Sequence, residues 1–172
     1  YTNPKAMVQS YLLTRKKMKD KFPYAVDPVT VTNDMCDLNG HMNVVYYNHI
    51  FEDGCWEFYK DMGFSESYFI EGFSSFTLEM NIRYLKELKE GEKGYPCFRM
   101  IDVGPKLIHY GGVLLTEDNQ VSATTENILA HVDMESRKSS VMPEHVFNNI
   151  KKMRDDHSQT GELDFDLRLK IK

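Results

Sequence analysis

The feature that most constrains the fold of this chain is a change in hydrophobic period near residue 75. From Tyr47 to Met62 apolar side chains recur every three or four residues, with charged side chains on the opposite face, which predicts one long amphipathic helix. After residue 75 apolar and polar side chains alternate, as in a half-buried strand, with Phe76 and Met80 expected on the same face. This alternation predicts four strands, at residues 76–84, 95–103, 107–116 and 121–134. Their short connections favour antiparallel hairpins, so we expect an α+β fold with one antiparallel sheet wrapped around one central helix.

The two ends of the chain add four elements to this prediction. Helices are expected at residues 7–22 and 143–153, and strands at residues 25–32 and 162–172. Pro23 stops the first helix, and Pro143 suits the first turn of the second. We expect the last strand to lie on a sheet edge or against a partner chain. The chain is therefore divided into an N-terminal helical extension, residues 1–25, and one domain, residues 26–172.

Composition excludes several classes of partner. The 172 residues are 41% hydrophobic and 27% charged, which is typical of a globular domain that buries its own core. The formal net charge of -5 argues against nucleic acid as the main partner, because phosphate binding needs a basic surface. No apolar stretch of the sequence approaches the ~18 residues of a membrane-spanning helix, so we expect no membrane partner.

The cysteines bear on the compartment. Cys36, Cys55 and Cys97 are odd in number and lack the C-x-x-C spacing of a zinc ribbon. They indicate free thiols in a reducing environment, so we expect a cytoplasmic protein. The sequence begins at Tyr1 and not at Met, and a processed organellar form is the alternative.

The segment DLNGHMN, from Asp37 to Asn43, concentrates polar chemistry in seven residues. Asn-Gly is a strong hairpin signal, but here a helix follows, so a hairpin fits poorly and Asn43 suits the helix N-cap. Capping does not account for Asp37, Asn39 and His41 together. A carboxylate can activate water, and the amides of a helix N-terminus can stabilise an oxyanion. The segment therefore predicts a reaction centre.

The longer segment CDLNGHMNVVYYNHIFEDG closely resembles the hot-dog-fold acyl-CoA thioesterases. The resemblance extends from about Val26 to about Phe147 and includes IRYLKELKEGE at 82–92 and TENILAHVDMESRKS at 125–139. Members with a D-x-N-G-H-M-N motif include thioesterases fused behind carnitine dehydrogenase, which act on betainyl-CoA and related acyl-CoAs. The D-x-N-x-H core is also similar to that of the plant acyl-carrier-protein thioesterases. Met35 stands where family members often have Trp, which leaves the acyl group open.

The resemblance implies a role for each residue of the motif. Asp37 takes the place of the catalytic carboxylate, as base or nucleophile, and Asn39 and His41 orient water and substrate. The backbone amides of Gly40 and His41 would polarise the thioester carbonyl. Four residues are expected to contact the substrate: Asn43, Tyr46, Tyr47 and Arg83.

The resemblance also implies partners and alternatives. We expect an acyl-CoA substrate, no cofactor beyond the coenzyme A of that substrate, and a homodimer or a tetramer of dimers. Aromatic side chains on and after the long helix could line an acyl pocket or surround a trimethylammonium group. A hot-dog enoyl-CoA hydratase and a non-catalytic acyl-CoA-binding domain are the alternatives. We expect no metal site, because His49 lies eight residues after His41 and a helical pair of ligands needs i, i+4 spacing.

Overall fold

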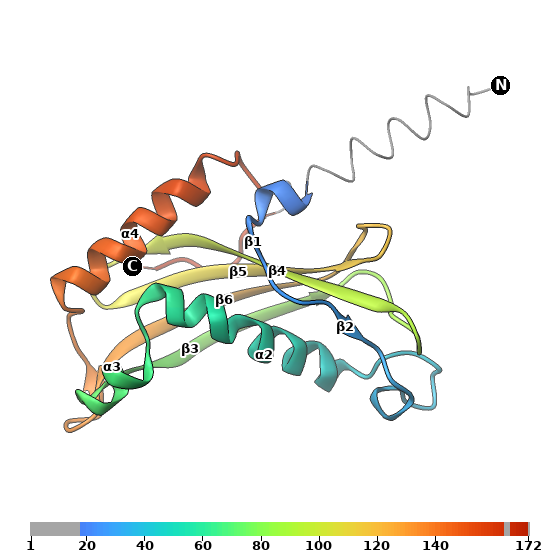
Figure 1. Ribbon diagram of the computed structural model, residues 1–172, viewed down its shortest axis with the longest axis horizontal. Helices are drawn as coiled ribbons and strands as arrows, with labels where there is room; N and C mark the ends of the chain where they lie inside the picture. The colour runs from blue at the N-terminus through green and yellow to red at the C-terminus, as the bar shows by residue number, and fades with distance from the viewer. Residues whose placement is uncertain (1–17, 164–165, 172) are drawn as a thin grey trace.

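The computed structural model describes residues 18–163 and 166–171, and all structural statements below refer to these residues. Seven strands form one antiparallel sheet in the order β1-β4-β5-β6-β3, with β2 also paired to β4 and β7 to β6 (Figure 1). The strands are β1 (Tyr24–Ala25), β2 (Val29–Thr30), β3 (Phe73–Tyr84), β4 (Lys93–Val103), β5 (Leu107–Thr116), β6 (Val121–Asp133) and β7 (Lys138–Ser139). The helices are the 3-10 turn η1 (Asn33–Met35) and the α-helices α2 (Val44–Met62), α3 (Glu66–Ile70) and α4 (Glu144–Ser158).

The long helix α2 lies against one face of the sheet and confirms the predicted architecture (Figure 1). Asn43 caps its start, accepting a hydrogen bond from the Val45 amide, and Gly63 ends it in a left-handed conformation with a φ of 115°. A Cβ atom on Gly54 would lie 3.2 Å from a methyl group of Val26, so glycine permits the close approach that its position predicts. The buried face of α2 consists of Tyr47, Ile50, Phe51, Cys55, Phe58 and Met62.

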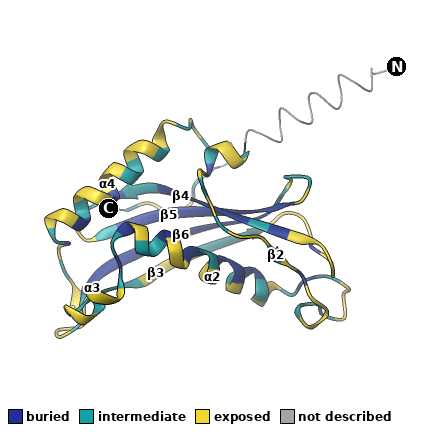
Figure 2. Ribbon diagram, in the orientation of Figure 1, coloured by how far each residue is buried: buried dark blue, intermediate teal, exposed yellow. Residues whose placement is uncertain are grey.

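The core lies between α2 and the central strands. Figure 2 shows β5 and β6 as almost entirely buried, whereas α2 and β3 carry exposed residues. Phe58 is fully buried, and its ring lies 5.7 Å from Phe98 and 5.9 Å from Tyr110. Helix α4 adds Val146 and Ile150 to the same core and covers the β4 edge beyond β1. Burial of these apolar side chains holds the helices on the sheet.

The predicted first strand, residues 25–32, is wrong as one continuous element. The structure divides it into β1 and β2, which both pair with β4. Ala25 pairs with Cys97 and Val29 with Gly94, so the outer segment holds one more residue than the β4 segment opposite. Pro28 lies in this interruption, where it does not have to supply an amide donor.

The predicted single apolar face of residues 76–84 is also wrong. The register of β3 against β6 shifts between Thr77 and Glu79, so Leu78 is an extra residue in a β-bulge. Phe76 therefore lies on the face away from α2, under the Arg137 guanidinium. Met80 lies on the opposite face, towards α2, as strand alternation requires. The extra residue exchanges the two faces of the sheet for the side chains beyond it, although apolar and polar residues still alternate in the sequence.

The C-terminal residues do not form the predicted strand. Residues 166–171 have no regular secondary structure, although their side chains alternate between exposed and half-buried as the sequence suggests. The backbone amides of Arg168 and Leu169 both donate to the same Glu126 carboxylate oxygen, at 2.8 and 3.0 Å. Consecutive amides of a strand point in opposite directions, so this contact is incompatible with strand pairing.

The N-terminal extension is described from residue 18. Residues 18–21 are helical and end before Pro23, as predicted, and residues 7–17 of the expected helix lie outside the described residues. Phe22 is fully buried against Cys97 and Val113, on the face of the sheet opposite α2. This face is therefore covered in part by the two ends of the chain.

Candidate active site

The segment from Cys36 to Met42 folds into a tight turn directly before α2. Cys36 and Met42 form an antiparallel bridge, and the Asp37 amide donates to the His41 carbonyl at 3.2 Å. The Gly40 amide donates to the Asp37 carbonyl at 2.9 Å, and Gly40 has a φ of 76°, which favours glycine. The hairpin turn that we expected to fit poorly is therefore present, although a single pair of residues, Cys36 and Met42, closes it. A helix begins two residues later, as predicted.

The turn holds both oxygens of the Asp37 carboxylate. The Asn39 amide donates to Oδ1 at 2.8 Å, and the Asn43 side-chain amide donates to Oδ2 at 3.0 Å. These bonds lower the pKa of Asp37, and the bond from the Asn39 backbone amide has the largest effect. The nearby His41 ring also lowers this pKa. Asp37 as a residue is half-buried, and its carboxyl group is ionised at neutral pH. Each oxygen accepts one of these bonds and keeps a second lone pair for water or substrate.

His41 is oriented by its own neighbourhood. Its Nδ1 atom lies 3.2 Å from the Met42 carbonyl oxygen, which can only accept. Nδ1 therefore carries a proton, and in the neutral ring Nε2 is left with its lone pair. The Glu87 carboxyl has a lowered pKa. Its main cause is Lys89, and the His41 imidazole makes a smaller contribution in the same direction. His41 is therefore within electrostatic reach of both the Asp37 and the Glu87 carboxylates.

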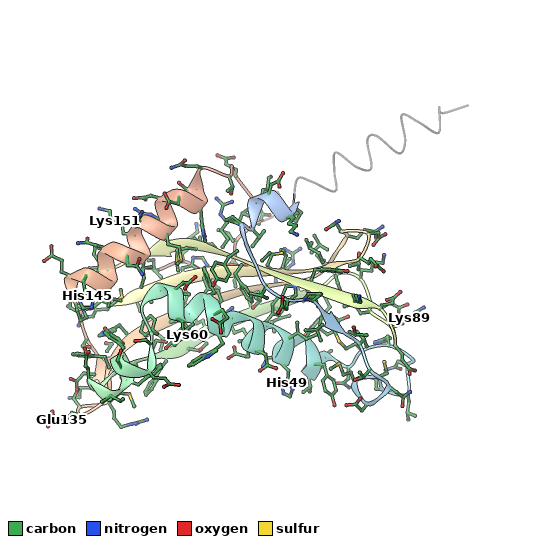
Figure 3. The ribbon with its side chains drawn as sticks, viewed as in Figure 1. His49, Lys60, Lys89, Glu135, His145 and Lys151 are labelled. Atoms are coloured by element: carbon green, nitrogen blue, oxygen red, sulfur yellow. The ribbon has the colours of Figure 1, made fainter. Side chains whose placement is uncertain are left out.

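A pocket of about 240 Å³ opens beside this imidazole. Its walls come from the start of α2 and from the end of β3 with the loop that follows: His41, Met42, Val44, Tyr47, Tyr84, Leu85, Lys86 and Glu87. The Met42 amide donates to the Leu88 carbonyl at 2.7 Å, which joins the two segments. The Tyr47 hydroxyl accepts from the Leu88 amide at 3.2 Å. Figure 3 shows Lys89, from this loop, at the end of the molecule where α2 begins.

The comparisons with known proteins agree with this geometry. Residues 30–150, which are more than half of the chain, match the thioesterase-like superfamily. The chain belongs to this superfamily. Membership confirms the family resemblance and supports the predicted class of enzyme, a thioester hydrolase.

Named relatives of the superfamily narrow the comparison. An L-carnitine dehydrogenase/betainyl-CoA thioesterase of Agrobacterium fabrum is 28% identical over 81% of this chain, which spans 29% of that longer protein. A betainyl-CoA thioesterase of Pseudomonas aeruginosa is 25% identical over 74% of this chain and 81% of its own length. A Staphylococcus aureus protein solved in complex with CoA has a TM-score of 0.75 and 27% identity, covering 85% of this chain and 92% of its own. These likenesses confirm the hot-dog fold.

The structure gathers some of the predicted superfamily site residues and separates others. Asp37, His41 and Asn43 lie together, and Tyr47 reaches the pocket beside them. Tyr46 does not line this pocket and packs against His49 instead. Figure 3 shows His49 projecting from α2 away from the sheet.

The structure places three other predicted site residues as follows, and their roles toward the substrate stay predictions. Arg83 precedes Tyr84 on β3, so strand alternation directs its side chain to the face away from the pocket. The Gly40 amide is already bonded to the Asp37 carbonyl, whereas the His41 amide has no hydrogen-bond partner within the described residues. Asn39 is exposed and contributes its backbone amide to Asp37.

Two pocket residues, Tyr84 and Glu87, were missed as candidates. Both belong to IRYLKELKEGE, which carried the family resemblance, but no local pattern indicates that it meets the motif. The signal that could have found them is the strand prediction itself, because β3 ends beside the start of α2.

The described residues hold no group of three or more His, Cys, Asp or Glu side chains suited to a metal ion. Across the same part of the chain, none of the helices combines the length and the apolar character that crossing a bilayer requires.

Asn43 joins the helix cap to the carboxylate, and the two roles can be separated. We expect Asn43→Ser to keep the cap, because serine caps helices about as well as asparagine, but to lose the bond to Asp37. Thioester hydrolysis should fall roughly 10- to 100-fold because the carboxylate is then held at Oδ1 alone, by the Asn39 amide. The pKa of Asp37 should rise, because a donor that lowers it is removed. Thermal unfolding, hydrolysis and an NMR titration of the Asp37 carboxyl measure the three effects.

Asn43→Ala is the matched control for the cap. It removes both bonds and should lower the free energy of unfolding by a further ~1 kcal/mol relative to Asn43→Ser. Full activity in Asn43→Ser would show that Asp37 does not need this support.

Proposed function

We propose that the protein is an acyl-CoA thioesterase in which Asp37 is the catalytic base or nucleophile. The observation that carries the proposal is an ionised carboxylate with both oxygens held, at the start of a helix and beside an imidazole with a free Nε2. A thioester carbonyl is electrophilic and a thiolate leaves readily, so the reaction mainly needs a placed nucleophile and an oxyanion site. No cofactor beyond the coenzyme A of the substrate is required.

The start of α2 supplies the proposed oxyanion site. Val44 is the first residue of the helix, so its amide has no acceptor within the helix. The His41 amide is also unbonded within the described residues. Both lie next to the pocket, and the helix dipole adds partial positive charge there. We therefore assign the His41 and Val44 amides to the developing oxyanion and leave Gly40 a structural role in the turn.

A homodimer is part of the proposal, because β3 is a long edge strand. Within the described residues it pairs on one side, with β6, over its whole length of 12 residues. Leu78 is 57% exposed and Met80 38% exposed, and Trp56 of α2 is 43% exposed. Long apolar edges of this kind are usually covered. A second copy that pairs along β3 would cover the edge.

The names of the relatives make a betaine-type acyl group the first candidate substrate. The hydratase alternative has less support, because the hot-dog hydratases use D-x-N-x-x-H, which is one residue longer than the segment from Asp37 to His41. A hydratase would also act on the double bond of an enoyl-CoA and leave the thioester intact.

Thiol release from a panel of acyl-CoAs tests the proposed function. The panel contains short, long, aromatic, enoyl and betainyl thioesters, and free CoA is measured with a thiol reagent. We expect CoA release from at least one short acyl-CoA. Loss of enoyl absorbance without release of CoA would favour the hydratase, and binding without either reaction would favour the non-catalytic domain.

A further inference from the structure

The pocket beside His41 has an unusual combination of walls for an acyl site. The rings of Tyr47 and Tyr84 lie 5.2 Å apart at an interplanar angle of 74°, so they form a corner. Tyr84 is 49% exposed and lines the pocket from β3, and the buried Tyr47, 3% exposed, lines it from α2. Glu87 adds a carboxylate to the lining. Aromatic faces together with a carboxylate attract a cation that is too poorly hydrated to prefer water.

The positive side chains near this pocket do not cancel that attraction. Lys86 donates to Gln120 at 3.0 Å and lies 3.7 Å from Asp118, on the β5–β6 side. Lys89 forms an ion pair with Glu87 at 2.9 Å, but both side chains are at least half exposed. An exposed pair of this kind is weak and can be replaced by a cation in the pocket.

We infer that Tyr47, Tyr84 and Glu87 form the recognition site for a quaternary ammonium group on the acyl part of the substrate. This inference rests on the proposed function, because it places the thioester at Asp37. In a betaine-type acyl group the nitrogen is two bonds from the carbonyl carbon, so its binding site must adjoin the reaction centre. His41 provides that adjacency, because it lines the pocket together with Glu87 and its carbonyl accepts a hydrogen bond from the Asp37 amide.

A second aromatic pocket is too distant to serve the same carboxylate. It lies further along α2 and has a volume of about 190 Å³, with Glu52, Trp56 and Tyr59 in its wall. Trp56 is twelve residues beyond Val44, which at the rise of an α-helix is roughly 18 Å. A betaine-type acyl group cannot span that distance. Trp56 therefore serves as a control for an aromatic residue outside the recognition site.

Two substrates of the same shape isolate the contribution of charge. Betainyl-CoA carries a trimethylammonium group, and 3,3-dimethylbutyryl-CoA carries an uncharged tert-butyl group in its place. The ratio of their kcat/KM values is measured for the wild type, Glu87→Gln and Tyr84→Leu. The intrinsic reactivity of each thioester does not depend on which variant hydrolyses it. A change in the ratio of the kcat/KM values between variants therefore reports a change in recognition.

We expect Glu87→Gln to lower the ratio roughly 2- to 5-fold, as for one exposed charge pair screened by water. Tyr84→Leu should lower it roughly 3- to 30-fold, as for the loss of one cation–π contact. Glu135→Gln, at the opposite end of the molecule in Figure 3, and Trp56→Leu should leave the ratio unchanged.

The outcomes separate the inference from the proposed function. If the wild type releases CoA from no acyl-CoA at all, both the inference and the proposed function are overturned. If it releases CoA from another member of the panel but from neither of these two thioesters, only the recognition site is overturned. If it hydrolyses them but Glu87→Gln and Tyr84→Leu leave the ratio unchanged or lower both rates equally, only the recognition site is overturned. An equal loss on both substrates would instead make Glu87 a catalytic or positioning residue. A fall in the ratio with Trp56→Leu alone would transfer recognition to the second pocket.

Discussion

Asp37→Asn should reduce thioester hydrolysis roughly 10²- to 10⁴-fold, the range for loss of a general base or its equivalent. The substitution removes the negative charge that, in the proposed function, attacks the thioester or activates water. It also places an amide NH₂ group where the carboxylate now accepts from the Asn39 or Asn43 amide, so one donor loses its acceptor. The measurement is CoA release from the best substrate of the panel under saturating conditions.

A matched variant shows whether the loss belongs to the site. Asp34 is an exposed aspartate three residues before Asp37, in η1, and Asp34→Asn should hydrolyse at close to the wild-type rate. Thermal unfolding of both variants should show a folded protein. Near-full hydrolysis by folded Asp37→Asn would falsify the assignment of Asp37 as base or nucleophile and would transfer that role to His41 Nε2.

The acid side of the pH profile gives an independent check on Asp37. Its two hydrogen bonds and the His41 ring lower the pKa of the folded-state carboxyl. The active anion is therefore present above that lowered pKa and is lost only as the pH falls through it. We expect NMR titration of the Asp37 carboxyl to give a midpoint below the ordinary aspartate value of about 3.9. A midpoint above this value would contradict the hydrogen bonds that hold the carboxylate.

Sequence periodicity predicted the elements that are specified by signals within their own segment. Helix α2 was predicted because the apolar stripe, the Asn43 cap and the Gly63 terminus all indicate the same element. Strands β5 and β6 were predicted within a residue of their observed bounds because the hairpin turns define their ends. In these segments every signal lies within the segment itself.

The elements that were missed depend on partners distant in sequence. The bulge at Leu78 exists only relative to β6, and no count of residues in β3 alone can show it. The position of the C-terminal segment depends on Glu126, a residue more than forty positions earlier in the chain. The Glu126 carboxylate accepts hydrogen bonds from two consecutive amides of this segment. Helix α3 has five residues, which is too short for a periodic pattern to emerge.

The candidate site shows the same division. Asp37, Asn39, His41 and Asn43 are neighbours in sequence, so the density of polar groups in this one segment is enough to indicate a reaction centre. The pocket that would select the acyl group needs Tyr84 and Glu87, which reach His41 because the Met42 amide bonds to the Leu88 carbonyl. The proposed chemistry therefore rests on a local motif, whereas the proposed recognition site could be found only from the fold.

Met80→Lys should dissociate the proposed homodimer and abolish most of the hydrolysis. Met80 is 38% exposed on the α2-facing side of the β3 edge, where a second copy would pair. In a two-fold dimer the substitution places two lysines near the interface, and repulsion adds to the loss of apolar contact. Removal of a desolvated interface contact of ~1.4 kcal/mol or more raises the dimer Kd at least tenfold, so we expect a shift from dimer to monomer in sedimentation velocity at micromolar concentration. Because the proposed site needs the second copy, kcat/KM should fall roughly tenfold or more with the loss of the dimer.

Val141→Lys separates this effect from a general effect of surface charge. Val141 is 60% exposed in the segment before α4, away from the β3 edge, so its substitution should leave both the sedimentation coefficient and the activity unchanged. A monomeric wild type with full activity would remove the dimer from the proposal and leave the Asp37 assignment intact. A Met80→Lys protein that stays dimeric would place the interface on another face, and the apolar β3 edge would then need a different cover. If the monomeric variant loses activity while Asp37 remains ionised in the NMR titration, the site depends on the second copy for substrate binding and not for the state of its carboxylate.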